Sequence, residues 1–151
     1  MKMTKPSLSL IAKWLLLVVV LLQLVFGRSH TNPPITKGPA WDSPQTGDIV
    51  RRACYDCHSN ETRWPWYSNV APISWLVQRD VNGGRAHLNF SEWDHPQRHA
   101  KDVAEQVKEG EMPPWYYLPM HPTARLSDAE KQALIAGAQK SLGPQAGPRE
   151  H

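Results

Sequence analysis

The longest apolar stretch of the chain lies near its N-terminus. An almost unbroken apolar run extends from Trp14 to Phe26 and is interrupted only by Gln23. Three basic residues precede it: Lys2, Lys5 and Lys13. A positively charged region followed by an apolar one is typical of an export signal. Such a signal leaves the N-terminus in the cytoplasm and places the rest of the chain outside.

The leader is predicted to stay on the protein as a membrane anchor. The apolar run counted from Leu8 to Phe26 has about 19 residues, which at roughly 1.5 Å per residue just spans a bilayer core of about 30 Å. Signal peptidase requires small residues at its cleavage site, whereas Phe26-Gly27-Arg28-Ser29 is large and charged. We therefore expect residues 1–27 to form one transmembrane helix, with cleavage of the leader as the alternative.

The next stretch, from Arg28 to about Gln45, is rich in Pro, Thr, Ser and Gly. This composition predicts an extended tether over residues 28–45, between the membrane and a folded domain. The domain is expected to occupy residues 46–142, and residues 143–151, which contain Gly and Pro, are expected to form a flexible tail.

Two helices are predicted in the first half of the domain. The first begins near Thr46 or Asp48 and directs a small set of apolar residues inward: Ile49, Val50 and Ala53. The second has Pro72 in its first turn and stops at Asn82-Gly83-Gly84, because paired glycines disfavour a helix.

Two more helices are predicted in the second half. One runs from about Pro96 to Lys108, with Val103 and Val107 at helical spacing, and ends at Gly110. The last opens with the capping box Ser127-Asp128-Ala129-Glu130 and directs Leu134 and Ile135 inward. Between them, residues 111–126 hold four prolines and are predicted to be irregular, and no segment alternates as a strand would.

The net charge gives no support for a nucleic-acid partner. The formal charge of +3 comes from 17 basic and 14 acidic residues, but three of the lysines belong to the leader. The exported part is left with 17 − 3 = 14 basic and 14 acidic side chains and is neutral. Because nucleic-acid binding depends on positive charge, this class of partner is not expected.

The most specific motif is Cys54-Tyr-Asp-Cys57-His58, since C-x-x-C-H is the attachment sequence of c-type haem. Two thiols three positions apart can bond to the two vinyl groups of the porphyrin, and the histidine becomes the proximal iron ligand. A zinc site would need further ligands, and the chain has no other cysteine. A thioredoxin-like pair would need a βαβ pattern, and a disulfide across two residues would be strained.

A second iron ligand is expected in the irregular segment. Met112 follows a predicted helix and precedes Pro113-Pro114, which would stiffen its loop. A thioether ligand favours reduced iron and raises the reduction potential. Met120 and His121, in the same loop, are the alternatives.

Aromatic residues are expected to pack around the flat macrocycle. Outside the leader the chain has six tryptophans: Trp41, Trp64, Trp66, Trp75, Trp93 and Trp115. Hydrogen-bond donors to the haem propionates are expected among four residues that follow the motif, and the sequence does not choose between them: Arg63, Trp64, Trp66 and Tyr67.

Several motifs in order resemble the bacterial haem-binding domain family, which comprises short exported proteins similar to monohaem cytochromes c. The resemblance covers roughly residues 35–142. It includes the C-x-x-C-H motif followed by Ser-Asn, and also Thr-x-Trp-Pro-Trp-Tyr-Ser from Thr62, Gly110-Glu-Met-Pro-Pro, and His121-Pro-x-Ala-x-Leu-Ser. It implies thioether bonds at Cys54 and Cys57, His58 as proximal ligand and Met112 as distal ligand.

The expected fold is therefore mainly α. It is a small cytochrome c-like domain of about four short helices, with long Pro-rich loops around one covalent haem c, plus the N-terminal transmembrane helix. The leader and the resemblance together predict a location in the bacterial cytoplasmic membrane, with the haem domain in the periplasm, or a soluble periplasmic protein if the leader is cut.

Three functions are compatible with these features. The favoured one is a one-electron carrier that serves redox partner proteins at the periplasmic face of the membrane. The second is a haem enzyme or a gas or peroxide sensor with an open distal site, in which a group of polar side chains would act as acids and bases: His87, His95, Arg98 and His99. The third is a structural role in which haem only stabilises the fold.

Overall fold

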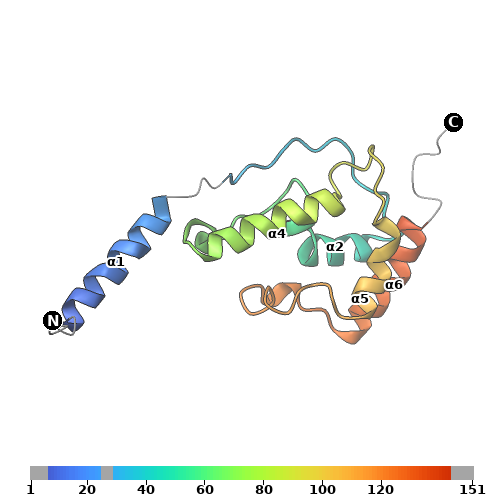
Figure 1. Cartoon of the computed structure of the whole chain (residues 1–151). Helices are drawn as coiled ribbons and strands as arrows, with labels where there is room; N and C mark the ends of the chain where they lie inside the picture. Colours follow the sequence, from blue (N-terminus) through green and yellow to red (C-terminus); the bar gives the residue numbers. More distant parts are fainter. Residues whose placement is uncertain (1–6, 25–28, 144–151) are drawn as a thin grey trace. The chain divides into compact units, whose positions relative to one another are not determined.

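The computed structural model describes residues 7–24 and 29–143, and it is helical wherever it is regular (Figure 1). Its longer helices are α1 (Leu8–Leu24), α2 (Pro44–Ala53), α4 (Ile73–His87), α5 (Val103–Lys108) and α6 (Asp128–Leu142). The short ones are α3 (Tyr55–His58), η1 (Trp66–Asn69), η2 (Ala100–Asp102) and η3 (Pro122–Ala124). The described residues contain no strand, and one isolated bridge joins Lys37 to Glu92. The prediction of a mainly α fold is confirmed.

The described residues divide into two compact units. The first unit combines residues 7–24 and 29–30 with residues 64–79, and the second combines residues 31–63 with residues 80–143. The boundary runs through α4, whose first half belongs to the first unit and whose second half belongs to the second. The predicted domain, residues 46–142, is thus interrupted by a segment that groups with the N-terminal helix.

The core of the second unit lies where α6 packs against α2 and α5 (Figure 1). Leu134 of α6 and Val50 of α2 are fully buried there, as the helical spacing predicts, and Phe90 is 1% exposed. The rest of the apolar cluster comes from all parts of this unit: Ile49, Tyr55, Leu88, Trp93, Val107, Ala138 and Leu142. At about 25 cal/mol per Å² of buried apolar surface, such a cluster is the main stabilising term of a small domain.

The helix α2 begins two residues before the predicted start. Ser43 is its N-cap and accepts a hydrogen bond from the amide of Thr46 at 3.2 Å, and Pro44 occupies the first turn. A serine followed by proline satisfies one free amide and supplies a helical φ angle, so this pair starts the helix more effectively than Thr46 or Asp48 would.

The predicted end of α4 at Asn82-Gly83-Gly84 is wrong, because the helix continues to His87. Glycine costs a helix up to about 1 kcal/mol relative to alanine, so local preference favours a stop. The tertiary structure overrides that preference, since α4 runs so close to residue 57 that only glycine fits at position 84.

The third predicted helix is shorter than expected but ends as predicted. Residues 96–97 are irregular, residues 98–99 form a turn, η2 follows, and α5 starts only at Val103. Gly110 adopts φ 77°, and the amide of Glu111 donates to the carbonyl of Gln106 at 3.0 Å. A glycine with positive φ and this bond pattern form a Schellman cap, which ends the helix and directs the following residues away from its axis.

The last helix starts as predicted. Ser127 is the N-cap of α6, and its capping box with Glu130 is complete. Arg52 of α2 pairs with the same glutamate, which connects α2 to the start of α6. The predicted tail lies outside the described residues except for Gly143.

Residues 31–43 of the stretch predicted as a tether lie outside any helix and belong to the second unit. The amide of Thr36 donates to the carbonyl of Ser91 at 2.9 Å, and the amide of Trp93 donates to the carbonyl of Lys37 at 2.9 Å. The amide side chain of Asn60 also donates to the carbonyl of Pro34 at 2.8 Å. These bonds hold the segment against the protein along its length.

The apolar leader forms α1, and its large apolar side chains from Leu8 to Leu21 are exposed. No helix among residues 7–24 and 29–143 is both long and apolar enough to cross a membrane. The predicted leader features at Lys2, Lys5 and residues 25–28 lie outside the described residues.

Candidate functional site

The first cysteine of the motif lies at the junction of two helices, and the second lies within α3. Cys54 ends α2 and begins α3, and its carbonyl accepts hydrogen bonds from the amides of Cys57 and His58 at 3.2 and 2.9 Å. The single turn of α3 therefore brings Cys54, Cys57 and His58 together, as the spacing predicts. The two sulfurs are free thiols. Burial raises the pKa of each to about 12, so both are protonated at neutral pH.

The imidazole of His58 has a defined tautomer. Its Nδ1 lies 3.1 Å from the carbonyl oxygen of Gly84 and 3.1 Å from that of Leu88. Carbonyl oxygens only accept, so Nδ1 carries the proton and the lone pair is on Nε2. Burial lowers the pKa of this histidine and keeps the ring neutral. A neutral imidazole that donates through one nitrogen to backbone carbonyls is the usual form of a metal-ligating histidine.

The helix α4 approaches the motif at Gly84. A Cβ at this position would lie 2.4 Å from the carbonyl oxygen of Cys57 and 3.2 Å from its Cβ. The missing side chain lets the carbonyl of Gly84 reach the His58 ring. The close contact between Gly84 of α4 and Cys57 therefore also positions the ring of His58.

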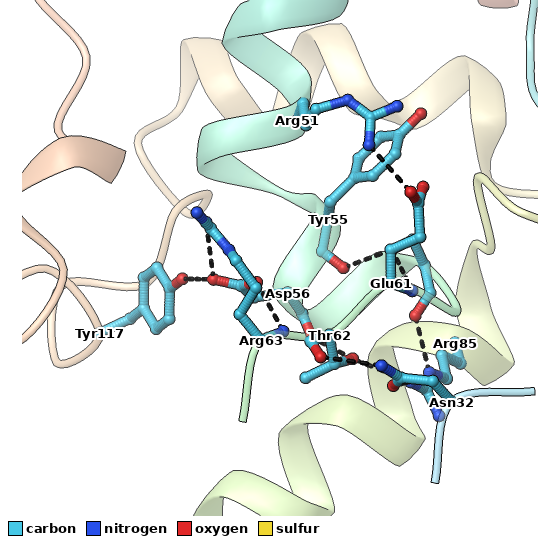
Figure 2. A network of polar contacts seen from close by, with 10 residues as sticks. Asn32, Arg51, Tyr55, Asp56, Glu61, Thr62, Arg63, Arg85 and Tyr117 are labelled. Carbon is cyan, nitrogen blue, oxygen red and sulfur yellow. Dashed lines mark hydrogen bonds and ion pairs between the residues drawn. The ribbon is translucent and has the colours of Figure 1, made fainter. Parts of the chain in front are cut away.

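Asp56, between the two cysteines, is the centre of a polar network (Figure 2). Its carboxylate accepts from the backbone amide and the guanidinium of Arg63, at 3.1 to 3.2 Å, and from the hydroxyl of Tyr117 at 2.9 Å. Its backbone carbonyl accepts from Thr62 at 2.8 Å. The bond to Asp56 raises the pKa of the Arg63 guanidinium, and burial raises that of the Tyr117 phenol. Both groups therefore act as donors at neutral pH.

Arg85 of α4 connects three segments of the second unit (Figure 2). Its guanidinium donates to the carbonyls of Ser59 and Thr31, at 2.8 and 2.9 Å, and to side-chain oxygens of Asn32 and Thr62, both at 2.8 Å. Four donors in a rigid planar group suit this arrangement, which a lysine could not reproduce. The arginine holds the extended N-terminal segment and the chain after the motif on the same helix.

Aromatic rings cover one side of the motif. Phe90 is stacked on Tyr55, with centroids 5.5 Å apart, and contacts the His58 ring edge-on at 6.4 Å. The amide of Phe90 donates to the carbonyl of His58 at 2.8 Å. Trp93 is also stacked on Phe90, with centroids 6.0 Å apart, and Trp41 is tilted against it at 5.4 Å. Of the six predicted tryptophans, these two pack close to the motif.

Met112 and Met120 have different environments. Met112 follows the Schellman cap of α5 and packs against the apolar cluster that contains Tyr55 and Phe90, as Cys54 also does. Met120 is 58% exposed. The ring of His121 is stacked on Tyr117, with centroids 3.7 Å apart, and its Nδ1 donates to the carbonyl of Tyr117 at 3.0 Å. Of the two methionines, Met112 packs against the apolar cluster that includes Tyr55 and Phe90, whereas Met120 is exposed.

The other predicted residues are distributed more widely. Arg63 is engaged by Asp56, and Trp64, Trp66 and Tyr67 belong to the first unit. The proposed distal acids and bases are all exposed, and three of them have local partners: His87 on Gly83, His95 near Glu92, and His99 on Asp102. Within the described residues, no three His, Cys, Asp or Glu side chains gather to hold a metal ion.

Sequence reasoning missed the residues that hold the site in place. In the sequence, Asp56 is only a spacer in the motif, and Gly84 belongs to a predicted helix stop. The sequence alone assigns no role to Arg85 or Tyr117. Asp56 could have been suspected because a carboxylate beside two cysteines is costly to bury without donors. Nothing local indicates the partner 61 positions away, Tyr117.

The residues present fit a haem attached at Cys54 and Cys57. The two unpaired thiols lie on one turn, the adjacent imidazole has its Nε2 lone pair available, and apolar rings flank it. No curated protein and no solved structure matches this chain significantly. The family described as haem-binding domain matches residues 17–140, which is most of the sequence. The chain is therefore a member of the haem-binding domain family, as its motifs predict.

Proposed function

We propose that this protein is a c-type haem protein that carries single electrons at the outer face of a membrane. The haem would be bonded to Cys54 and Cys57, with His58 and Met112 as the two axial ligands. When bound, haem supplies a one-electron ferric/ferrous couple. The observation that carries the proposal is the orientation of the His58 ring. Its Nδ1–H donates to two backbone carbonyls, which leaves the lone pair of Nε2 available to bind iron.

The protein's part in this function is to orient the ligands. The carbonyls of Gly84 and Leu88 prevent rotation of the imidazole and increase its basicity, which strengthens a bond to iron. Met112 follows the Schellman cap at Gly110, and its partly buried side chain packs against the apolar cluster, an environment that suits a weak thioether ligand. A saturated iron in an apolar environment favours electron transfer over substrate binding.

The leader supports a location at the membrane. The described part of the apolar run is helical, its large apolar side chains are exposed, and lysines precede it. We expect this segment to hold the haem domain at the periplasmic face of the bacterial cytoplasmic membrane, where the redox partners would be other proteins. Diffusion in two dimensions would then increase the rate of encounter with partners in the same membrane.

Substitution of the two methionines tests the proposal. In the haem-loaded protein, Met112→Ala is expected to convert a low-spin spectrum to high spin, lower the reduction potential and permit carbon monoxide binding. Met120→Ala is the matched control, since its side chain is 58% exposed, and should leave all three unchanged. If the parent protein is already high spin and binds carbon monoxide, the electron-carrier function is rejected in favour of a haem enzyme or sensor. If the spectrum changes only with Met120→Ala or only with His121→Ala, that residue and not Met112 is the distal ligand.

A further inference from the structure

Part of the first unit exposes large apolar residues and buries serines. Along residues 66–76, Trp66 is 73% exposed and Ile73 is 49% exposed, whereas Ser68 and Ser74 are 0 and 1% exposed. Val70 and Leu76 are also exposed, at 41 and 38%. Isolated apolar residues on a surface need no explanation, but a segment whose burial pattern is inverted indicates that its outer face meets an apolar environment.

The exposed apolar residues recur at regular intervals along η1 and the start of α4. Trp66, Val70, Ile73 and Leu76, here called the apolar patch, are spaced by four, three and three positions. Trp66 lies on η1, Val70 follows it in extended conformation, and Ile73 and Leu76 lie on α4. Backbone bonds connect the two helices: the amide of Val70 donates to the carbonyl of Tyr67 at 3.0 Å, and that of Ser74 donates to the carbonyl of Val70 at 2.9 Å. The spacing is that of the apolar face of an amphipathic helix, here divided between two short elements.

The apolar patch is joined to the outer end of the leader helix. The side chain of Gln23, one residue before the end of α1, accepts from the amide of Ala71 at 3.0 Å and donates to its carbonyl at 3.3 Å. Ala71 lies between Val70 and Ile73 of the patch. Gln23 is the polar interruption of the apolar run, so the patch is fixed where α1 would leave the bilayer.

The composition of the segment matches the membrane–water interface. Residues 64–79 contain four aromatic side chains, no Asp or Glu, and Arg79 as their one Lys or Arg, although 21% of the chain is charged. Tryptophan and tyrosine are enriched at the headgroup level of bilayers, and an uncharged segment loses little hydration on entering it. We propose that the apolar patch docks on the lipid surface and forms a second membrane contact beside the leader. This inference rests on the proposed membrane location.

Fluorescence quenching by brominated lipids tests the proposal. The full-length haem protein is reconstituted in phosphatidylcholine vesicles with and without brominated acyl chains, and the quenched amplitude per mole is compared for the parent, Trp66→Phe and Trp115→Phe. Trp115 is the matched control, because it is 81% exposed and lies in the second unit. We expect Trp66→Phe to reduce the quenched amplitude and Trp115→Phe to leave it unchanged.

An alkaline wash of the vesicles separates the two proposals. If the protein stays with the vesicles and Trp66→Phe has no effect on quenching, the patch does not contact lipid and the inference is overturned, while the anchor stands. If the protein washes off and Trp66→Phe still reduces quenching, the patch binds lipid and only the anchor fails. If the protein washes off and Trp66→Phe has no effect on quenching, both the anchor and the lipid contact are overturned. If Trp66 is shielded from aqueous acrylamide but is not quenched by brominated lipid, the patch contacts protein and the inference is rejected.

Discussion

The hydroxyl of Tyr117 donates a hydrogen bond of 2.9 Å to Oδ2 of Asp56, the residue between the two cysteines of the motif. This bond connects the turn that would hold haem to the loop that follows Met112. Asp56 also accepts from Arg63, so its carboxylate binds both the segment that follows the motif and the loop that contains Tyr117. Because Asp56 is 9% exposed, neither donor can be replaced fully by water.

Tyr117→Phe is expected to loosen the loop without preventing haem attachment. Loss of a hydrogen bond to a charged, buried acceptor should lower the free energy of unfolding by about 1–3 kcal/mol. The haem-loaded variant should also show a fraction of high-spin iron, because the loop with Met112 is less firmly held. Chemical denaturation and the absorption spectrum measure the two effects. Tyr116→Phe is the control, since Tyr116 is 41% exposed, and an equal effect there would contradict the assigned role.

Gly84→Ala is expected to disrupt the site. The added Cβ would lie 2.4 Å from the carbonyl oxygen of Cys57, which belongs to the backbone and cannot move aside cheaply. We expect a loss of about 1–3 kcal/mol in the free energy of unfolding, as in overpacked cores, and lower haem content. The neighbouring glycine provides the control: Gly83 has no atom within 4 Å of a Cβ, so Gly83→Ala should stabilise the helix by about 0.5–1 kcal/mol. An equal change in stability in both variants would show that the close approach at Gly84 does not decide the effect.

Replacement of both Cys54 and Cys57 by alanine is expected to abolish covalent haem. Each single variant can retain one thioether bond, whereas the double variant has none. Haem staining after denaturing electrophoresis measures this directly, and circular dichroism shows whether the domain still folds. Staining that persists in the double variant would rule out attachment at these two residues.

The first turn of α6 is expected to weaken in acid. Hydrogen bonds from the backbone amide and hydroxyl of Ser127 lower the pKa of the Glu130 carboxyl below its ordinary value of 4.5. A depressed pKa means that the stabilising contribution is present above the ordinary pKa and is lost as the pH falls through the lower folded-state value. The parent should therefore exceed Glu130→Gln in stability at pH 7, and the difference should shrink below about pH 4.5. Urea unfolding across this range measures it, and a difference that stays constant would contradict the assignment.

Local signals in the sequence determined much of this protein. The C-x-x-C-H motif carries its chemistry in five consecutive residues, so the turn that joins Cys54, Cys57 and His58 was predictable. The capping box at Ser127 and the glycine stop at Gly110 are equally local, because each depends on residues within one helical turn. Burial of Val50, Val107 and Leu134 followed from helical periodicity.

Only the tertiary structure decided what holds the motif in place. The paired glycines in α4 favour a stop when taken alone, but the approach of that helix to Cys57 makes Gly84 necessary and supplies the carbonyl that orients His58. The hydrogen bonds between Asp56 and Tyr117 and between Gln23 and Ala71 also join parts far apart in the chain. Hydrophobic periodicity and capping act over a few residues, whereas the space beside a backbone and the partner of a buried charge depend on segments that meet only after folding.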